Sequence, residues 1–227
     1  MEKKFLDIQN SLRGQIDLTD GFDESELRLV AGVDCAYWEG DGAEYGVCCI
    51  EVVDYKTHEV IESKSRYDRI DIPYMPGFLA FRELPLVKET SKLLETEPDL
   101  FMFDGNGILH PRRMGIATHA SFELGVPTIG VAKTFYRVRE DSIYMEPSNK
   151  FGDWTPITVD GTELARAVRT RPRVKPVFVS PGNRVSLDTA TRVVLSLVEK
   201  DSRIPIPTRL ADIATHSRRE RIRTGLD

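Results

Sequence analysis

The sequence of 227 residues has few cysteines and no long apolar run, and both shortages exclude whole classes of protein. Its three cysteines, Cys35, Cys48 and Cys49, offer neither a disulfide framework nor the spacing of a metal site. No stretch approaches the length of a membrane span, and the segment MEKKFLDIQNSLRGQI lacks the apolar core of a secretory signal. We therefore expect a cytoplasmic protein with no membrane partner.

The net charge of −5 is also small, and its sign argues against a nucleic-acid partner. The distribution of charge argues for one. Residues 1–163 contain 30 acidic and 17 basic residues, whereas residues 164–227 contain 6 and 14. Such a contrast within one chain is typical of a protein with a polyanion-binding face. A solvated basic surface explains the same numbers, so composition leaves both interpretations open.

Hydrophobic periodicity predicts a single α/β domain over residues 1–227, and 41% hydrophobic residues suffice for its core. After an amphipathic N-terminal helix, three strand-like runs with short connections are expected to pair antiparallel. Strands and helices then alternate, which predicts parallel strands and a mixed five-stranded sheet flanked by helices. The predicted strands are residues 27–38, 44–55, 59–70, 100–104 and 127–132, and the helices between them are 78–94 and 114–125.

The rest of the chain is less regular. An insertion at about 135–175 is rich in proline, glycine and charge, with a hairpin expected at WTPITVDGTEL. A strand at 176–182, a helix at 186–199 and a basic, helical C-terminal tail follow.

Two aspartates and a glutamate occupy informative places in this pattern. Asp34 lies inside the apolar run of the first strand, and Asp104 ends the strand that begins at Leu100. If these strands pair in parallel, the two carboxylates lie side by side, and Glu83 on the preceding helix can reach over them. Each acid taken alone has an ordinary explanation: a strand edge in water, a turn before glycine, or an exposed helix face.

Three carboxylates in one place repel one another, at about 4 kcal/mol per pair at 4 Å and an effective dielectric constant near 20, and a divalent cation removes this cost. All-oxygen ligation with open positions suits Mg²⁺, with Mn²⁺ as a substitute, and does not suit Zn²⁺. A site of this kind can orient a phosphodiester, activate water and neutralise the leaving oxygen. The residues therefore predict metal-dependent phosphodiester hydrolysis.

Four segments, in this order, resemble the motif series of endonuclease V, the deoxyinosine-directed repair nuclease. They are VAGVDCAY (30–37), PYMPGFLAFRELP (73–85), DGNGILHPRRMGIATH (104–119) and GVPTIGVAKTFY (125–136). VFVSPG and RIPIPTRLAD (203–212) fit as well, so the resemblance spans roughly residues 27–212. It implies an RNase H-like fold. It also implies cleavage of DNA at the second phosphodiester 3′ to deoxyinosine, leaving 3′-hydroxyl and 5′-phosphate ends.

The resemblance further implies which residues are catalytic. Asp34 and Asp104 would coordinate the metal, and Glu83 would bind it through water or position the nucleophile. His110 and Lys133 would lie near the scissile phosphate and its departing oxygen. Without the resemblance, Lys133 is a surface lysine with a buried stem, and His110 is a loop histidine.

The PYMP segment resembles the family's wedge, since two prolines stiffen the backbone and let Tyr74 enter a duplex at small entropic cost. The flipped hypoxanthine would lie in a pocket of backbone that excludes guanine by its exocyclic amine. An exposed proline turn is the ordinary alternative. The predicted substrate-binding residues are Pro73, Tyr74, Met75, Pro76, Gly77, Leu79, Gly105 and Ile116.

One position departs from the family pattern. Relatives are expected to have SPGH beside the metal cluster, and the sequence SPGN places Asn183 there. Asparagine cannot take up a proton at neutral pH, so catalysis would be slower or would change its pH or metal preference if that histidine shuttles protons. Asp188, at the start of the next helix, is a candidate substitute contact.

Three functions follow from these residues. The leading one is a Mg²⁺-dependent endonuclease acting on DNA that contains deoxyinosine, with Arg112, Arg113 and the basic C-terminal part against the backbone. The alternatives are an endoribonuclease specific for inosine-containing RNA and, because of Asn183, a lesion-binding protein with impaired catalysis. No dimer seam is evident in the sequence, so a monomer is expected.

Overall fold

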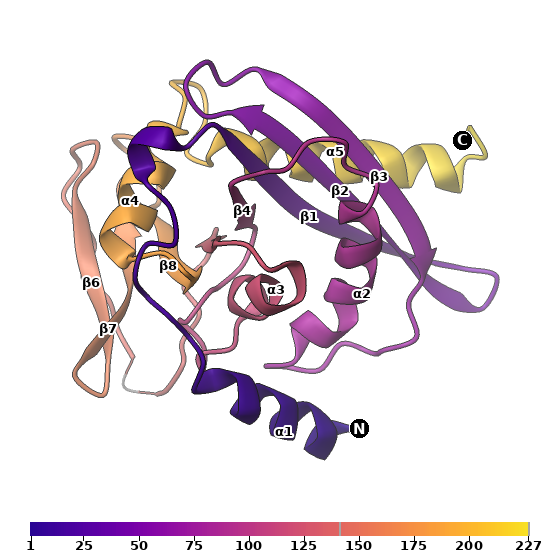
Figure 1. The fold of residues 1–227 in the computed structure, drawn as a ribbon, viewed down its shortest axis with the longest axis horizontal. Helices are drawn as coiled ribbons and strands as arrows, with labels where there is room; N and C mark the ends of the chain where they lie inside the picture. The colour runs from indigo at the N-terminus through magenta and orange to yellow at the C-terminus, as the bar shows by residue number, and fades with distance from the viewer. Residues whose placement is uncertain (141, 227) are drawn as a thin grey trace.

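Eight strands form one mixed sheet with helices on both faces (Figure 1). The computed structural model describes residues 1–140 and 142–226. The strands are β1 (Leu29–Gly40), β2 (Ala43–Asp54), β3 (Val60–Arg69), β4 (Leu100–Phe103), β5 (Thr128–Ala132), β6 (Trp154–Val159), β7 (Thr162–Val168) and β8 (Val177–Asn183). The helices are α1 (Glu2–Arg13), α2 (Leu79–Ser91), α3 (Ile116–Leu124), α4 (Leu187–Ser196) and α5 (Ile206–Arg223), with a short 3₁₀ turn η1 (Glu24–Glu26).

The sheet has the strand order β3-β2-β1-β4-β5-β8-β7-β6. This confirms the predicted α/β class and the antiparallel β1–β2–β3 unit, followed by the parallel strands β4 and β5. The predicted number of five strands is wrong. The strand expected at 176–182 is β8, which pairs antiparallel with β5, and the expected hairpin is β6–β7, which joins the sheet through β8.

Alternation along the strands divides the core between the two faces of the sheet. Val30 and Met102 face α4 and the start of α5, and their neighbours Ala31 and Phe101 face α2 and α3. In Figure 1, α5 lies behind β1 and β2, whereas α2 lies in front of them. A third cluster fills the space between β6, β7, β8 and the segment after β5. Among the described helices, none is long and apolar enough to cross a membrane.

The register of β1 and β4 positions the candidate site. Val33 is the partner of Phe103 in the parallel pair, so the next residues, Asp34 and Asp104, lie side by side. The N–H of Asp104 donates to the Val33 carbonyl at 3.4 Å. The pairing of β1 and β4 thus places these two aspartates side by side, as the sequence predicts.

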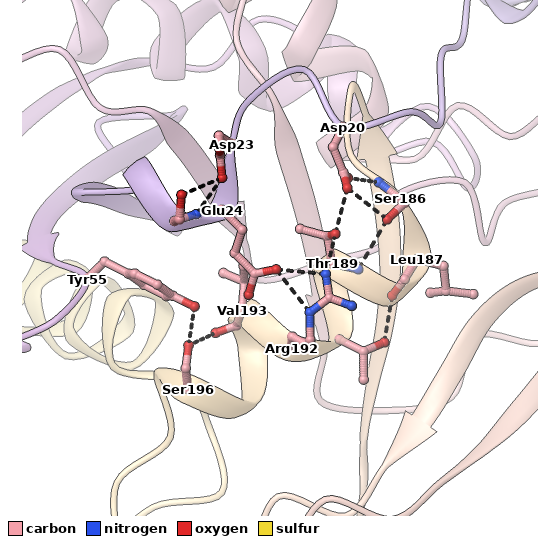
Figure 2. A network of polar contacts seen from close by, with 12 residues as sticks. Asp20, Asp23, Glu24, Tyr55, Ser186, Leu187, Thr189, Arg192, Val193 and Ser196 are labelled. Atoms are coloured by element: carbon pink, nitrogen blue, oxygen red, sulfur yellow. Dashed lines mark hydrogen bonds and ion pairs between the residues drawn. The ribbon is translucent and has the colours of Figure 1, made fainter.

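The segment between α1 and β1 crosses the molecule and is tied to α4 (Figure 2). Asp20 accepts hydrogen bonds from the Ser186 backbone N–H at 2.6 Å and from the Thr189 hydroxyl at 2.7 Å. Arg192 donates to Glu24 at 2.7 Å. These contacts hold the C-terminal end of the segment against α4. At its other end, α1 packs against α2 through Phe5 and Phe81.

Candidate active site

Three aspartates that are far apart in the sequence converge beside α5. Asp34 of β1, Asp104 after β4 and Asp212 of α5 each offer a carboxylate oxygen, and these oxygens all lie within 4.8 Å of one another. Gly32 allows this approach, because a Cβ there would overlap the backbone of Pro207 at the start of α5. We call these three residues the acidic trio.

The environment of Asp34 disfavours its negative charge. Burial raises the pKa of Asp34 to about 6, and the charges of Asp104 and Asp212 add to the increase. A hydrogen bond from the Thr215 hydroxyl to Asp34 Oδ2, 2.8 Å long, acts in the opposite direction. A bound cation would reduce both the repulsion between the three carboxylates and the cost of burying the charge of Asp34.

Lys133 supplies the positive charge nearest to the trio. Its Nζ lies 2.6 Å from Asp104 Oδ2 and 2.9 Å from Asp212 Oδ1. Burial lowers the pKa of Lys133, but the hydrogen bonds to these two carboxylates outweigh burial and raise it. One ammonium group against three carboxylates leaves negative charge in excess. The all-oxygen donor set therefore fits a hard divalent cation such as Mg²⁺ or Mn²⁺.

Glu83 lies beside the trio and is not a member of it. It projects from α2 and accepts a hydrogen bond from the Tyr37 hydroxyl at 2.7 Å. Burial raises the pKa of Glu83 to about 7, the bond from Tyr37 opposes the shift, and the charge of Asp34 reinforces it. The structure thus brings together two of the three predicted ligands, Asp34 and Asp104, and adds Asp212. Glu83, the third predicted ligand, is close enough for the charges of Asp34 and Asp104 to raise its pKa.

Asp212 had no assigned role in the sequence analysis, although it ends the segment RIPIPTRLAD. Its local pattern contains a usable signal. Thr208, Ala211 and Thr215 are small, buried residues at helical spacing on α5, and Asp212 borders this stripe. An acid at the edge of a closely packed helix face is a stronger candidate ligand than an acid on the outer face.

A small pocket lies next to the trio. Its volume is about 150 Å³, below the range of about 300–1,000 Å³ that is usual for drug-sized ligands, so it suits one ring system. Five predicted substrate-binding residues line it: Tyr74, Gly77, Leu79, Gly105 and Ile116. Tyr136 also lines it and was not predicted, although it ends the fourth motif. Tyr74 is 65% exposed at the rim.

The remaining predicted wedge residues frame this rim. Pro73 and Pro76 are exposed, Met75 is half-buried, and the Met75 carbonyl accepts the Phe78 N–H at 2.9 Å in a tight turn. Gly77 has a φ of +79°, a conformation that glycine adopts without strain. The loop therefore presents Tyr74 outward while Gly77 turns the chain toward the pocket.

His110 lies in the wall of the pocket. Its Nδ1 accepts the backbone N–H groups of Arg112 at 3.2 Å and Met114 at 3.3 Å. These two donors assign the ring proton to Nε2, which donates to the Gly77 carbonyl at 3.2 Å. Burial, with the charge of Arg112, lowers the pKa of His110 to about 4. His110 is thus a neutral group that holds the loop at Gly77, and its place beside the scissile phosphate stays a prediction.

Arg112 contacts the same carbonyl. Its guanidinium donates to the Gly77 carbonyl at 2.7 Å and to the side-chain oxygen of Gln9, and it lies 4.4 Å from the Phe78 ring centroid. These contacts tie the half-buried Arg112 to the loop, and its contact with a nucleic-acid backbone stays a prediction.

Asn183 and Asp188 lie away from the trio, contrary to the expectation from SPGN. Asn183 is paired with Thr128 at the start of β5, whereas Lys133 follows the end of that strand. The Asn183 side chain accepts the Asp17 N–H at 2.8 Å and donates to the Ser121 hydroxyl at 3.2 Å. Asp188 forms an ion pair with Arg166 at 2.6 Å. The hypothesis of a lesion-binding protein with impaired catalysis depended on Asn183 lying beside the metal cluster, so this argument for it no longer holds.

The sequence and the fold resemble those of one described family. Residues 10–213 match the family model described as Endonuclease V. An Endonuclease V of Bacillus subtilis (strain 168) is 51% identical over 215 residues, which cover 95% of this chain and 90% of that protein.

Two solved structures extend the likeness to three dimensions. The crystal structure of the Endonuclease V from Bacillus subtilis has a TM-score of 0.95 and 49% identity, covering 99% of this chain and 94% of that one. Endonuclease V of Ciona intestinalis, solved in complex with a 24mer DNA containing an inosine followed by a ribo-adenosine, has a TM-score of 0.86 and 29% identity. That match covers 97% of this chain and 98% of the other.

Proposed function

Because the chain belongs to the endonuclease V family and is therefore a nuclease, a hydrolase of phosphodiester bonds, we propose that it nicks DNA at deoxyinosine. Cleavage would fall at the second phosphodiester 3′ to the lesion and leave 3′-hydroxyl and 5′-phosphate ends. One observation carries the proposal: Asp104 belongs to the acidic trio, and the next residue, Gly105, lines the pocket. A base in that pocket places its own strand at the trio.

Recognition would begin at the exposed loop. Tyr74 enters the duplex, and the extruded base turns into the pocket behind it. Extrusion costs a few kcal/mol and costs least at a weak pair, which favours inosine over a normal pair. Hypoxanthine lacks the exocyclic amine of guanine, and a pocket of about 150 Å³ leaves little room for that group.

The trio would hold Mg²⁺, which when bound supplies charge neutralisation and a more acidic water. Lys133, with its ammonium group at the trio, would donate hydrogen bonds to the phosphate as negative charge develops there. Glu83, whose pKa is near 7, can hold or release a proton at its carboxyl group at neutral pH. Tyr37 fixes that carboxyl group by its hydrogen bond.

A substrate containing ribonucleotides is the second candidate. It is favoured by the Ciona relative, which was solved with DNA that has a ribo-adenosine after the inosine. A 2′-hydroxyl next to the lesion offers a donor and an acceptor that DNA lacks, so it can change the rate without a change in the base pocket.

The test is a nicking assay on matched oligonucleotides labelled at the 5′ end. One duplex contains a single deoxyinosine, a second has deoxyadenosine at that place, and an RNA carries inosine in the same sequence. We expect Mg²⁺-dependent cutting of the first, none of the second, and products of the length that the proposed position predicts. Cutting of the RNA alone would replace the leading function by the second. Inertness of both lesion substrates with Mg²⁺ and with Mn²⁺ would refute the proposal.

A further inference from the structure

The N-terminal helix α1 contacts the pocket wall through the polar side chain of Gln9. Phe5 and Gln9, one helical turn apart, are the buried residues of α1. Phe5 stacks on Phe81 of α2 with ring centroids 3.9 Å apart, which fixes the helix in place. Gln9 has no exposed surface, although glutamine is usually a surface residue. A fully buried amide needs partners, and those of Gln9 all belong to the pocket region.

Every hydrogen bond of the Gln9 side chain goes to a residue that forms or supports the pocket. Its Nε2 donates to the Gly77 carbonyl at 3.1 Å and to the Met114 carbonyl at 3.4 Å. Its Oε1 accepts from Nε of Arg112. Gly77 and Met114 both line the pocket, from segments 37 residues apart in the sequence, so Gln9 joins two of its walls.

Three donors meet at one oxygen. Gln9, His110 and Arg112 all direct an N–H group to the Gly77 carbonyl, at 3.1, 3.2 and 2.7 Å. Gly77 is the residue with positive φ at the base of the wedge loop, and a Cβ there would lie 2.9 Å from the Arg112 guanidinium. The carbonyl is therefore held in one orientation, which fixes where the loop leaves the pocket and where Tyr74 is presented.

We infer that Gln9 is a positioning residue for lesion recognition: by holding Gly77, Met114 and Arg112, it pre-forms the pocket and the wedge loop before substrate arrives. The inference rests on the proposed function. A loop that is ordered in advance loses less entropy on binding, so Gln9 acts on substrate affinity and base selectivity. It does not touch the acidic trio, and the maximal rate should be almost independent of it.

Two substitutions separate the contacts of Gln9. Gln9→Glu keeps the shape and an oxygen for Arg112 but cannot donate to the Gly77 and Met114 carbonyls. Gln9→Leu removes all three hydrogen bonds. Gln15→Glu and Gln15→Leu are the matched controls, because Gln15 is exposed just after α1 and its side chain donates only to the Ser11 carbonyl among the contacts described.

The measurements are KM and kcat on the deoxyinosine duplex, the ratio of cutting at deoxyinosine to cutting at deoxyadenosine, and the thermal unfolding midpoint. We expect KM to rise about fivefold in Gln9→Glu, which corresponds to about 1 kcal/mol, and more in Gln9→Leu, which also loses the bond from Arg112. Selectivity should fall in parallel, with kcat changed less than twofold. The Gln15 variants should match the wild type.

The outcomes are distinguishable from failure of the proposed function. If the wild type does not cut deoxyinosine DNA, the function is refuted. If it does, and folded Gln9 variants keep the wild-type KM and selectivity, the positioning role is refuted. A loss confined to kcat would also refute it. If Gln9→Leu does not fold, the isosteric Gln9→Glu variant decides alone, since its carboxylate still has Arg112 as a partner.

Discussion

Replacing Asp34 by asparagine should stabilise the metal-free protein at neutral pH while abolishing nicking. Burial beside Asp104 and Asp212 raises the pKa of Asp34 from 3.8 to about 6, so folding disfavours its charged form. At 1.36 kcal/mol per pH unit, this shift of about 2 units corresponds to about 3 kcal/mol. Asparagine keeps an oxygen for the Thr215 hydroxyl and carries no charge. The negative charge of Asp34, which would bind the cation, therefore destabilises the metal-free protein.

The effect has a defined pH window. Because the folded-state pKa lies above the unfolded value, the stability that a protonated Asp34 contributes is fully present below about pH 4. It is lost as the pH rises through about 6. Wild type and Asp34→Asn should therefore be about equally stable near pH 4 and diverge up to pH 7. In a chain of this size, about 3 kcal/mol raises Tm by roughly 6–12 °C.

The assay is thermal unfolding followed by circular dichroism in EDTA at pH 4, 6 and 8. Asp7→Asn is the control, because it removes one carboxylate from the exposed face of α1. Addition of Mg²⁺ should raise the Tm of the wild type more than that of Asp34→Asn. A variant that is no more stable than the wild type at pH 8, or equally stabilised at pH 4, would contradict the electrostatic account of the trio.

Three further substitutions test the site. Asp212→Asn should reduce nicking with Mg²⁺ by at least about a hundredfold in a single-turnover assay, as for the loss of an important electrostatic group. Cutting at nearly the wild-type rate would show that Asp212 has no catalytic role. Tyr74→Ala should lower the preference for deoxyinosine over deoxyadenosine while leaving Mn²⁺ affinity by calorimetry unchanged; retained preference would exclude the wedge role. Lys133→Met should tighten Mn²⁺ binding, because the ammonium no longer competes for Asp104 and Asp212, yet slow cutting; weaker binding would show that Lys133 supports the cation site.

The sequence predicts contacts that follow from strand pairing. Asp34 and Asp104 could be placed together because a short apolar strand after a helix is expected to run parallel to β1, and the residues after paired positions are neighbours. The pocket residues Gly77 and Gly105 were identified from segments that resemble the family's motifs, although these segments do not themselves show how the chain packs. In both cases, short stretches of sequence were sufficient to predict the residues.

Contacts that depend on how distant elements pack could not be predicted in this way. Asp212 reaches Asp34 only because α5 packs closely against Gly32, 175 residues before Pro207, and periodicity does not give that contact. The alternation in β6 and β7 indicated a hairpin, but the edge that it joins is decided by the antiparallel pairing of β8 with β5. The role of His110 was taken from the resemblance, whereas the backbone N–H groups that donate to its Nδ1 come together only in the folded loop.

One segment joins the chemistry to the recognition of the base. Asp104 belongs to the trio, and Gly105 and Ile116 line the pocket. Between them the chain is pinned to β8, where the Gly107 N–H donates to the Ser180 hydroxyl and the Ile108 N–H to the Pro181 carbonyl, both at 2.8 Å. Adjacent residues have Cα atoms about 3.8 Å apart, so the trio and the pocket cannot separate. A base bound in the pocket would thereby be held at a fixed distance from the carboxylates, which gives a physical reason for the proposed cleavage at a constant offset from the lesion.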